Sequence, residues 1–309
     1  MSRNNNQASQ DFYNRKLANH YTDYNVRQEQ PLMDFLLAVV TSGNRTRAKQ
    51  LLAQKMVYVD QVITTQYNTP LLPGQLVQIA SRGNLHTLNS EFVRVVYEDA
   101  FLIVIDKAPG ILSNSPLEGR ENSVKRILDE YLQRGKKPVT AHIVHRLDRY
   151  TSGLMVYAKR RDVQETFMNY WRDIVTDRRY EAVVEGRMER DTGTVESWLY
   201  DDKRFMTHSS PTETDHSRLA ITHYRTLQRT ADRSLVEFRL ETGRKNQIRV
   251  HMQDLGHPVV GDLKYGAQTD PVGRVCLHAC RLAFVHPVTK EQMQFDSPVP
   301  AEFGKLLII

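Results

Sequence analysis

The sequence predicts an α+β fold for this chain of 309 residues, divided into one large domain and one small domain. Its 40% hydrophobic and 25% charged residues are typical of a soluble globular protein. Apolar residues at helical spacing predict helices at 123–132, with Ser123 as the cap, and at 162–174. Short apolar or alternating runs predict strands at 92–97, 101–105, 154–158, 179–186, 220–224 and 235–240.

Composition narrows the class of protein further. No run approaches the roughly 20 apolar residues that span a bilayer, and residues 1–7 lack the apolar core of a secretory signal. Two cysteines argue against a disulfide scaffold, so we expect a soluble cytoplasmic protein. The formal net charge of +6 favours a polyanionic partner.

The first 91 residues are expected to form three segments. Residues 1–30 are a polar extension without a sustained apolar period, disordered or loose, although their aromatic and basic side chains could contact a nucleic acid or pack on the body. Residues 31–80 form the small α/β domain, with two helices, a strand at 56–59 and a turn and strand at 72–79. Residues 81–91 are expected to be the linker to a large domain at 92–309.

The most informative stretch is 145–159, in which a charged head precedes a buried strand. His145, Arg146, Asp148 and Arg149 fall within five positions, and a turn at 151–153 leads into the apolar run. Two arginines beside Asp148 would favour the ionised carboxylate. Such a carboxylate in a cleft can attack a sugar C1′, as in glycosidases. It can equally form a structural ion pair at a strand end, and the stretch alone leaves both interpretations open.

Two separate blocks carry a family resemblance. His145-Arg146-Leu147-Asp148 with Thr151-Ser152-Gly153-Leu154 resembles the HRLD-x-x-TSG-L signature of the RluA-type RNA pseudouridine synthases. Residues 240–251 resemble their later GRTHQIRVH motif, with Lys245 where Thr or Ser is usual and Asn246 where His is usual. Residues 256–262 also match the family, and residues 106–110 resemble its N-K-P-x-G motif, which supports the fold more than the chemistry. Several blocks in the family's order, over about residues 92–300, are more specific than one short motif.

The resemblance implies isomerisation of uridine to pseudouridine on a mixed, largely antiparallel sheet with helices around a cleft. Asp148 would attack C1′ or abstract a sugar proton to give a glycal-like intermediate, and either route breaks the N1–C1′ bond. Arg249 would pair with Asp148. Tyr180, which alone would be interpreted as a core aromatic, would stack on the flipped uracil, and Arg146 would fill the vacated stack.

The resemblance also implies the partner. Residues 31–80 resemble the S4 RNA-binding domain, although their basic helix could simply be a solvated face. RNA is expected as the substrate, with ribosomal RNA favoured over transfer RNA; no membrane, redox cofactor, nucleotide or metal is implied, and we expect a monomer. The residues assigned to RNA binding, besides Arg146, are Arg45, Arg47 and Lys49 in the small domain and Arg244 and Gln247 in the later motif.

Other interpretations of the same residues remain. Cys276, His278 and Cys280, or His142 with His145, could bind metal, but zinc sites usually need four ligands from two separated pairs, so core packing is expected. The polar stretch 200–218 is expected to be a loop near RNA or a surface excursion. A non-catalytic RNA-binding or ribosome-assembly factor is one rival function. A hydrolase using Asp148 with His145 is the other, and it lacks a nucleophile elbow or paired carboxylate.

Overall fold

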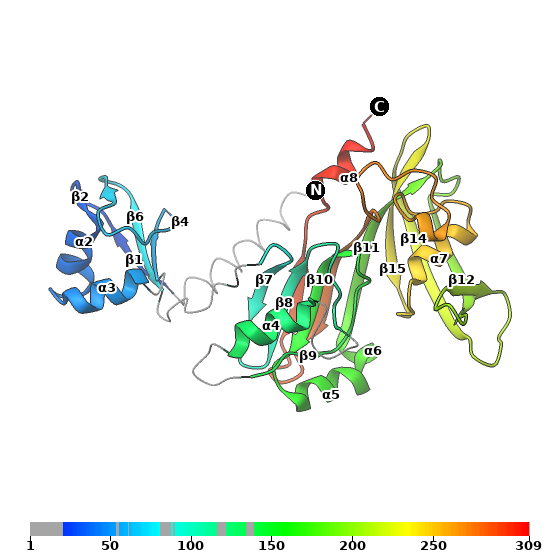
Figure 1. Ribbon diagram of the computed structural model, residues 1–309, viewed down its shortest axis with the longest axis horizontal. Helices are drawn as coiled ribbons and strands as arrows, with labels where there is room; N and C mark the ends of the chain where they lie inside the picture. The colour runs from blue at the N-terminus through cyan, green and yellow to red at the C-terminus, as the bar shows by residue number, and fades with distance from the viewer. Residues whose placement is uncertain are drawn as a thin grey trace. The chain divides into compact units, whose positions relative to one another are not determined.

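The computed structural model describes residues 21–53, 56–60, 62–80, 88, 90–115, 122–133 and 139–308. The chain forms two compact units, residues 1–87 and 88–309, each with its own buried core (Figure 1). The division lies inside the segment expected to be the linker, 81–91, of which residues 81–87 and 89 are outside the described ranges.

The N-terminal unit consists of short helices on a small antiparallel sheet. Its helical elements are α2 (Leu32–Phe35), which continues as the π-helical turn η1 (Leu36–Val40), and α3 (Arg45–Ala53). The Asn44 side chain caps α3 by accepting the Arg47 N–H at 2.9 Å. The sheet has the order β1-β6-β3-β4, beside a separate β2-β5 pair, with bounds β1 Tyr21–Asn25, β2 Gln30–Pro31, β3 Val57–Val59, β4 Val62–Ile63, β5 Pro70–Leu71 and β6 Leu76–Ala80.

Residues 21–30 differ from the polar extension that the sequence predicts. Strand β1 pairs with β6 along its whole length, and the Gln78 amide donates to Asp23 at 3.0 Å across the pair. Val26 is buried in the core of the unit. The pairing is not visible in local periodicity, because β1 is an edge strand whose polar side chains face solvent. Residues 1–20 lie outside the described residues.

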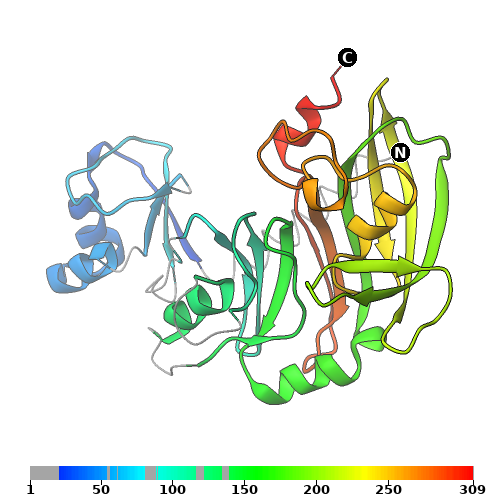
Figure 2. The same ribbon diagram turned by 45° about the vertical axis from the view of Figure 1, so that its right-hand side comes forward.

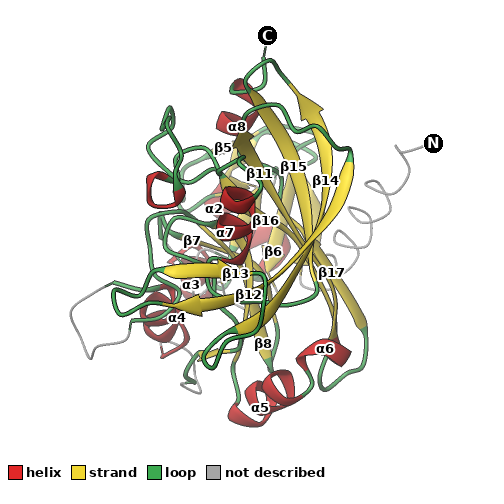
Figure 3. Cartoon of the chain, turned by 90° about the vertical axis from the view of Figure 1, so that its right-hand side faces the viewer, coloured by secondary structure: helices red, strands yellow, loops and turns green. Residues whose placement is uncertain are grey.

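The larger unit is built on one extended, curved sheet (Figure 3). Its order is β13-β12-β14-β15-β11-β16-β10-β8-β7, with β17 paired to β16 and β9 to β10. Among the described strands only β10 and β16 pair in parallel, so the predicted mixed, largely antiparallel sheet is confirmed. The bounds are β7 Val93–Glu98, β8 Leu102–Lys107, β9 His142–Ile143, β10 Ser152–Ala158, β11 Val175–Glu185, β12 Thr192–Asp201, β13 Thr207–Ser210, β14 Arg218–Arg229, β15 Arg233–Leu240, β16 Leu277–Val285 and β17 Gln292–Asp296.

Helices cover this sheet and its ends. They are α4 (Val124–Gln133), α5 (Arg161–Asn169), α6 (Trp171–Ile174), α7 (Gln247–Asp254) and α8 (Ala301–Lys305), with a 3-10 turn η2 at Leu263–Tyr265. Apolar residues of α4, α7 and α8 share one core with β8, β10 and β11. Figures 1 and 2 show α8 at one end of the long strands and α5 with α6 at the other.

The structure contains helices at both predicted positions, 123–132 and 162–174, with one difference. Ser123 caps α4 as expected, because its Oγ accepts the Arg126 N–H at 3.3 Å. The helix expected at 162–174 is two helices, because Tyr170 leaves the helical region with φ −121° and ψ 29°.

The prediction of a loop at 200–218 is partly wrong. Its middle forms β13, which pairs with β12 from Trp198↔Ser210 to Asp201↔Thr207. Strand β13 consists of Thr, His and two Ser residues, so the apolar pattern that marks a strand is missing from it. No described helix is long and apolar enough to span a bilayer.

Candidate active site

The loop between β9 and β10 carries Asp148, and hydrogen bonds from Ser113 and Gly110 hold its backbone. Leu147 is buried, and Ser113 Oγ both donates to the Leu147 carbonyl at 2.7 Å and accepts its N–H at 3.1 Å. The Arg149 carbonyl accepts the Gly110 N–H at 2.8 Å. Asp148 therefore projects from a loop whose backbone is held on both sides, while its own side chain stays 24% exposed.

Gly153 explains why the loop can enter the sheet at this point. It has φ +113°, and a Cβ built there would lie 2.3 Å from the Ala279 carbonyl oxygen. No side chain fits that gap, because β10 and β16 approach closely where their parallel pairing begins. This pairing brings the end of the Asp148 loop against the C-terminal part of the chain.

Lys107 is a residue whose role the sequence did not reveal. It is fully buried, and its Nζ donates to the carbonyls of Ala108 at 2.9 Å, Ile111 at 3.1 Å and Arg149 at 3.0 Å. Burial lowers the pKa of Lys107 to about 7, partly opposed by the nearby Asp148 carboxylate. The signal was its place in Asp106–Gly110, which the resemblance connected with the fold rather than with the site.

Arg249 on α7 contacts two carboxylates, and its stronger partner is not the expected one. Its Nε and Nη2 donate to the two oxygens of Asp262 at 2.6 and 2.7 Å, and this carboxylate is 1% exposed. Its Nη1 donates to Asp148 Oδ2 at 3.3 Å. Burial alone would lower the pKa of Arg249, but the bonds and charge of Asp262, then of Asp148, raise it overall. Asp262 fixes Arg249, and Arg249 presents one donor to Asp148.

Asn246, where the resembling family usually has His, orients the same arginine. Its Oδ1 accepts Arg249 Nη1 at 2.8 Å, and its Nδ2 donates to the Tyr265 hydroxyl at 2.9 Å. The Tyr265 ring lies 4.8 Å from the Arg249 guanidinium carbon. Asn246 has φ 54°, a left-handed conformation that asparagine tolerates better than most residues. The substitution is therefore compatible with a role in holding Arg249.

Tyr180 on β11 lies close to both Asp148 and Arg178. The side chain is buried, with 8% of the residue exposed. Burial raises the pKa of Tyr180; Arg178 opposes the shift and Asp148 adds to it. The phenol therefore stays neutral in the folded protein.

The other sequence-predicted residues are distributed differently from the prediction. Arg146 is exposed on the Asp148 loop, and Arg244 is half-buried, with its Nε donating to the Leu219 carbonyl at 2.9 Å. Gln247 is 2% exposed and is bonded to Thr242, Thr222, the Arg244 N–H and the Ile221 carbonyl. These bonds correct its assignment to RNA binding, because the amide is used inside the protein. Arg45, Arg47 and Lys49 are exposed on α3 of the N-terminal unit.

Two motif histidines support the fold. His145 Nε2 accepts the Val156 N–H at 3.0 Å. His251 is fully buried between the hydroxyls of Ser197 at 3.0 Å and Thr222 at 2.8 Å. Burial lowers the pKa of His251 to about 4, so its imidazole is neutral in the folded protein at pH 7.

We therefore predict acid destabilisation through His251. Its pKa is near 6.5 in the unfolded chain and about 4 in the folded protein, so between these values only the unfolded state binds the proton. The free energy of unfolding should fall by about 1.4 kcal/mol per pH unit from this group as the pH drops. Urea titrations of wild type and His251→Gln at pH 7 and pH 5 test this. A stability difference that does not shrink at pH 5 would contradict it.

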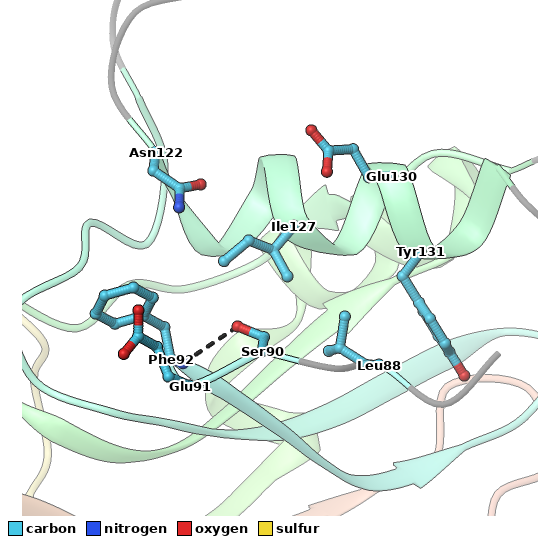
Figure 4. Close-up of a pocket in the computed structure, with 8 residues that line it drawn as sticks. All are labelled: Leu88, Ser90, Glu91, Phe92, Asn122, Ile127, Glu130 and Tyr131. Carbon is cyan, nitrogen blue, oxygen red and sulfur yellow. Dashed lines mark hydrogen bonds between the residues drawn. The ribbon is translucent and has the colours of Figure 1, made fainter.

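The described part of the chain contains no group of three or more His, Cys, Asp or Glu residues placed to hold a metal ion. Cys276 and Cys280 are free and buried, as core packing requires. A separate hollow of about 310 Å³ lies between α4 and the start of β7 (Figure 4), and none of its lining residues belongs to the Asp148 site.

The fold defines the class of protein. The solved structure titled Human RNA Pseudouridylate Synthase Domain Containing 4 matches with a TM-score of 0.55 over 68% of this chain and 90% of that chain, at 23% identity. A second, Human RNA Pseudouridylate Synthase Domain Containing 1, matches with a TM-score of 0.56 over 69% of this chain and 84% of that chain, at 22% identity. The chain has the fold of a pseudouridine synthase domain.

Sequence comparison gives the family. A family model described as RNA pseudouridylate synthase matches residues 101–254. An uncharacterized RNA pseudouridine synthase of Bacillus subtilis (strain 168), YjbO, is 38% identical over 69% of this chain and 75% of its own length. Ribosomal large subunit pseudouridine synthase D of Vibrio vulnificus (strain CMCP6) is 32% identical over 85% of each chain. This chain belongs to the RNA pseudouridylate synthase family, and it is an isomerase that converts uridine to pseudouridine in RNA.

Proposed function

We propose that this enzyme isomerises specific uridines of large-subunit ribosomal RNA, and that Asp148 is the catalytic carboxylate. The observation that carries the proposal is the 3.3 Å contact from Arg249 Nη1 to Asp148 Oδ2, on a loop whose backbone is anchored on both sides. The geometry gives Asp148 a fixed position, a compensated charge and a side chain that is 24% exposed. These are the properties of a carboxylate that acts on a substrate.

The chemistry requires the target nucleotide to leave its stack, because the N1–C1′ bond is otherwise out of reach. Arg146, exposed on the Asp148 loop, would occupy the vacated place. Asp148 would then attack C1′, or remove a sugar proton, and the N1–C1′ bond would break. The uracil leaves with the electron pair of that bond and turns, and C5 bonds to C1′. This displaces the Asp148 carboxylate from C1′ or, on the glycal-like route, goes with return of the sugar proton. C5 then loses its proton and N1 gains one. Product and substrate are isomers, so the reaction consumes no other reagent.

Tyr180 would hold the uracil while it turns. A free base in the pocket must neither escape nor exchange with water, so an apolar wall beside Asp148 favours recapture. The buried ring of Tyr180 can supply that wall, and its neutral hydroxyl adds no charge there. Arg249, fixed by Asp262, would keep Asp148 oriented through both halves of the reaction.

The choice of ribosomal RNA follows from the relatives. Several of them, 31–33% identical over 83–87% of this chain, carry the name ribosomal large subunit pseudouridine synthase D. The exposed basic residues of α3 add a second surface that could hold a large structured RNA.

Tritium release from C5-labelled RNA tests the function directly, because the C5 proton is lost only when pseudouridine forms. Purified enzyme should release tritium from large-subunit ribosomal RNA and not from a transfer RNA pool. Chemical mapping of pseudouridine in cells with and without the gene should then identify the position. Release from transfer RNA alone would overturn the ribosomal assignment while leaving the chemistry intact.

We also propose that residues 31–80 are an S4-like RNA-binding domain. Deleting residues 1–87 should weaken binding to long structured RNA and flatten its salt dependence, because phosphate contacts release counterions. The substitutions Arg45→Ala, Arg47→Ala and Lys49→Ala together should reproduce part of this weakening. The log–log salt slope should decrease by about 0.7–0.9 for each phosphate that the variant no longer neutralises. Affinity should change much more than the saturated single-turnover rate.

The matched control replaces Arg126, Arg160 and Arg161 by Ala, since all three pair with carboxylates within the protein. A packing role for the N-terminal unit makes the opposite forecast. The salt slope would then stay unchanged in truncation and triple variant, and the truncation would have a lower thermal midpoint.

A further inference from the structure

In the part of the chain that the structure describes, four arginines without carboxylate partners lie beside the active site. We infer that Arg172, Arg178, Arg218 and Arg244, here called the arginine cluster, form a phosphate-binding site for the RNA backbone next to the target nucleotide. The inference rests on the proposed function and deepens it, because it identifies the surface of the catalytic unit that holds the strand.

Arg178 on β11 is the centre of the cluster. Its Nη2 donates to the Thr242 carbonyl at 3.3 Å, and its Cζ lies 5.3 Å from the centre of the Trp171 ring. A Cβ at Gly243 would lie 3.2 Å from Arg178 Nη1. One guanidinium therefore connects the start of α6 with the loop that precedes α7. Arg172 follows Trp171 in α6 and therefore lies on the α6 side of Arg178.

Arg244 extends the cluster on the side of the loop that precedes α7. Its Nε bond to the Leu219 carbonyl, at 2.9 Å, fixes its guanidinium beside the start of β14, where Arg218 stands. Burial lowers the pKa of Arg244, and the charges of Arg218 and Arg172 lower it further. Arginines from α6, β11, β14 and the loop after β15 thus converge on one region.

Several other arginines of the unit, by contrast, form ion pairs with carboxylates. Arg179, the neighbour of Arg178 on β11, donates to Asp177 at 2.8 Å and to Glu237 at 3.3 Å. Arg225 and Arg281 pair with Glu237 and Asp296 at 3.0 and 2.6 Å. Within the described ranges, no member of the arginine cluster forms such an ion pair.

Assembled positive charges without counter-charges repel one another, and a bound polyanion removes that cost. Guanidinium groups match phosphate oxygens in a bidentate geometry, which suits a phosphodiester better than a single carboxylate. The cluster is also close to the reacting groups, since the Arg244 N–H donates at 2.9 Å to Gln247 on α7, the helix whose Arg249 contacts Asp148 at 3.3 Å. A phosphate held there would fix the register of the strand without reading its sequence.

The test uses Arg172→Gln with Arg218→Gln in the full chain, because both side chains are exposed and their replacement should leave the fold intact. Filter binding of an RNA that contains the mapped uridine is measured over a series of KCl concentrations. The log–log salt slope should decrease by about 1.4, from ~0.7 for each single-strand phosphate contact, and affinity at low salt should fall about tenfold or more. Lysine at both positions should restore the slope.

The matched control, Arg225→Gln with Arg281→Gln, removes the same charge from arginines that are paired within the protein. It should leave the slope unchanged. Equal salt slopes for the two double variants would overturn the site. A wild-type salt slope in the Arg172→Gln, Arg218→Gln variant, with its thermal midpoint unchanged, would also overturn it. Failure of the proposed function would show separately, as absence of tritium release by the wild-type enzyme. The binding measurement does not depend on it, because binding does not require turnover.

Discussion

The Asp148→Asn variant is expected to bind RNA and to lose isomerisation. Asparagine keeps the size of the side chain and removes the charge that we propose attacks C1′ or accepts a sugar proton. Loss of a group with that role costs at least about a thousandfold in turnover. Stability should change little, because Asp148 is 24% exposed and Arg249 keeps its bonds to Asp262.

Single-turnover tritium release and filter binding measure the two effects separately. Asp215→Asn serves as the control, since this carboxylate is exposed and outside the site. Turnover by Asp148→Asn within tenfold of wild type would remove Asp148 from the mechanism and return it to the interpretation of a structural ion pair at a strand end.

Replacing Arg249 by Met is expected to cost both stability and activity. The change leaves the Asp262 carboxylate buried, 1% exposed and without its bidentate partner. Breaking a buried pair in this way costs about 3–5 kcal/mol in the free energy of unfolding. Isomerisation should fall as well, because Asp148 loses the donor at 3.3 Å that orients it.

A second substitution separates the two losses. Arg249→Met with Asp262→Leu removes both buried charges, which should recover much of the stability without recovering turnover. Arg249→Lys keeps a charge but not the planar fork, so it should be intermediate. Urea titration and single-turnover rates measure the series. If Arg249→Met is as stable as wild type, and loses RNA affinity at an unchanged rate, Arg249 contacts RNA instead.

Much of the catalytic fold could be predicted from local pattern. The apolar run after Gly153 forms β10, the alternating run at 235–240 forms most of β15, and Ser123 caps its helix. In each case the determining interaction is short in sequence, within one strand or one turn. The weak points were polar strands, β1 and β13, because their stability comes from pairing with β6 and β12 rather than from their own apolar residues.

The active site was predictable in its residue types and less so in its connections. The two motifs suggested Asp148 and Arg249, whose side chains the structure brings within 3.3 Å of each other. Asp262 was only part of a matching block and proved to be the main partner of the arginine. Gln247 has a motif position and a polar side chain, which suggested RNA binding, yet four internal bonds use its amide. The roles of Lys107 and Arg178 could be inferred only from their contacts in the folded protein.

The sequence by itself determined the class of fold, the charged loop before β10 and the family of the enzyme, because these depend on periodicity and on ordered motifs. Only the tertiary structure decided which charges are compensated. Asp148 and Arg249 are 101 residues apart, and the parallel pairing of β10 with β16 fixes the loop that presents the carboxylate. The same folding pairs Arg179 with two carboxylates and leaves its neighbour Arg178 without one among the described residues. Adjacent residues of a strand point to opposite faces, so their partners come from elements that are distant in the sequence.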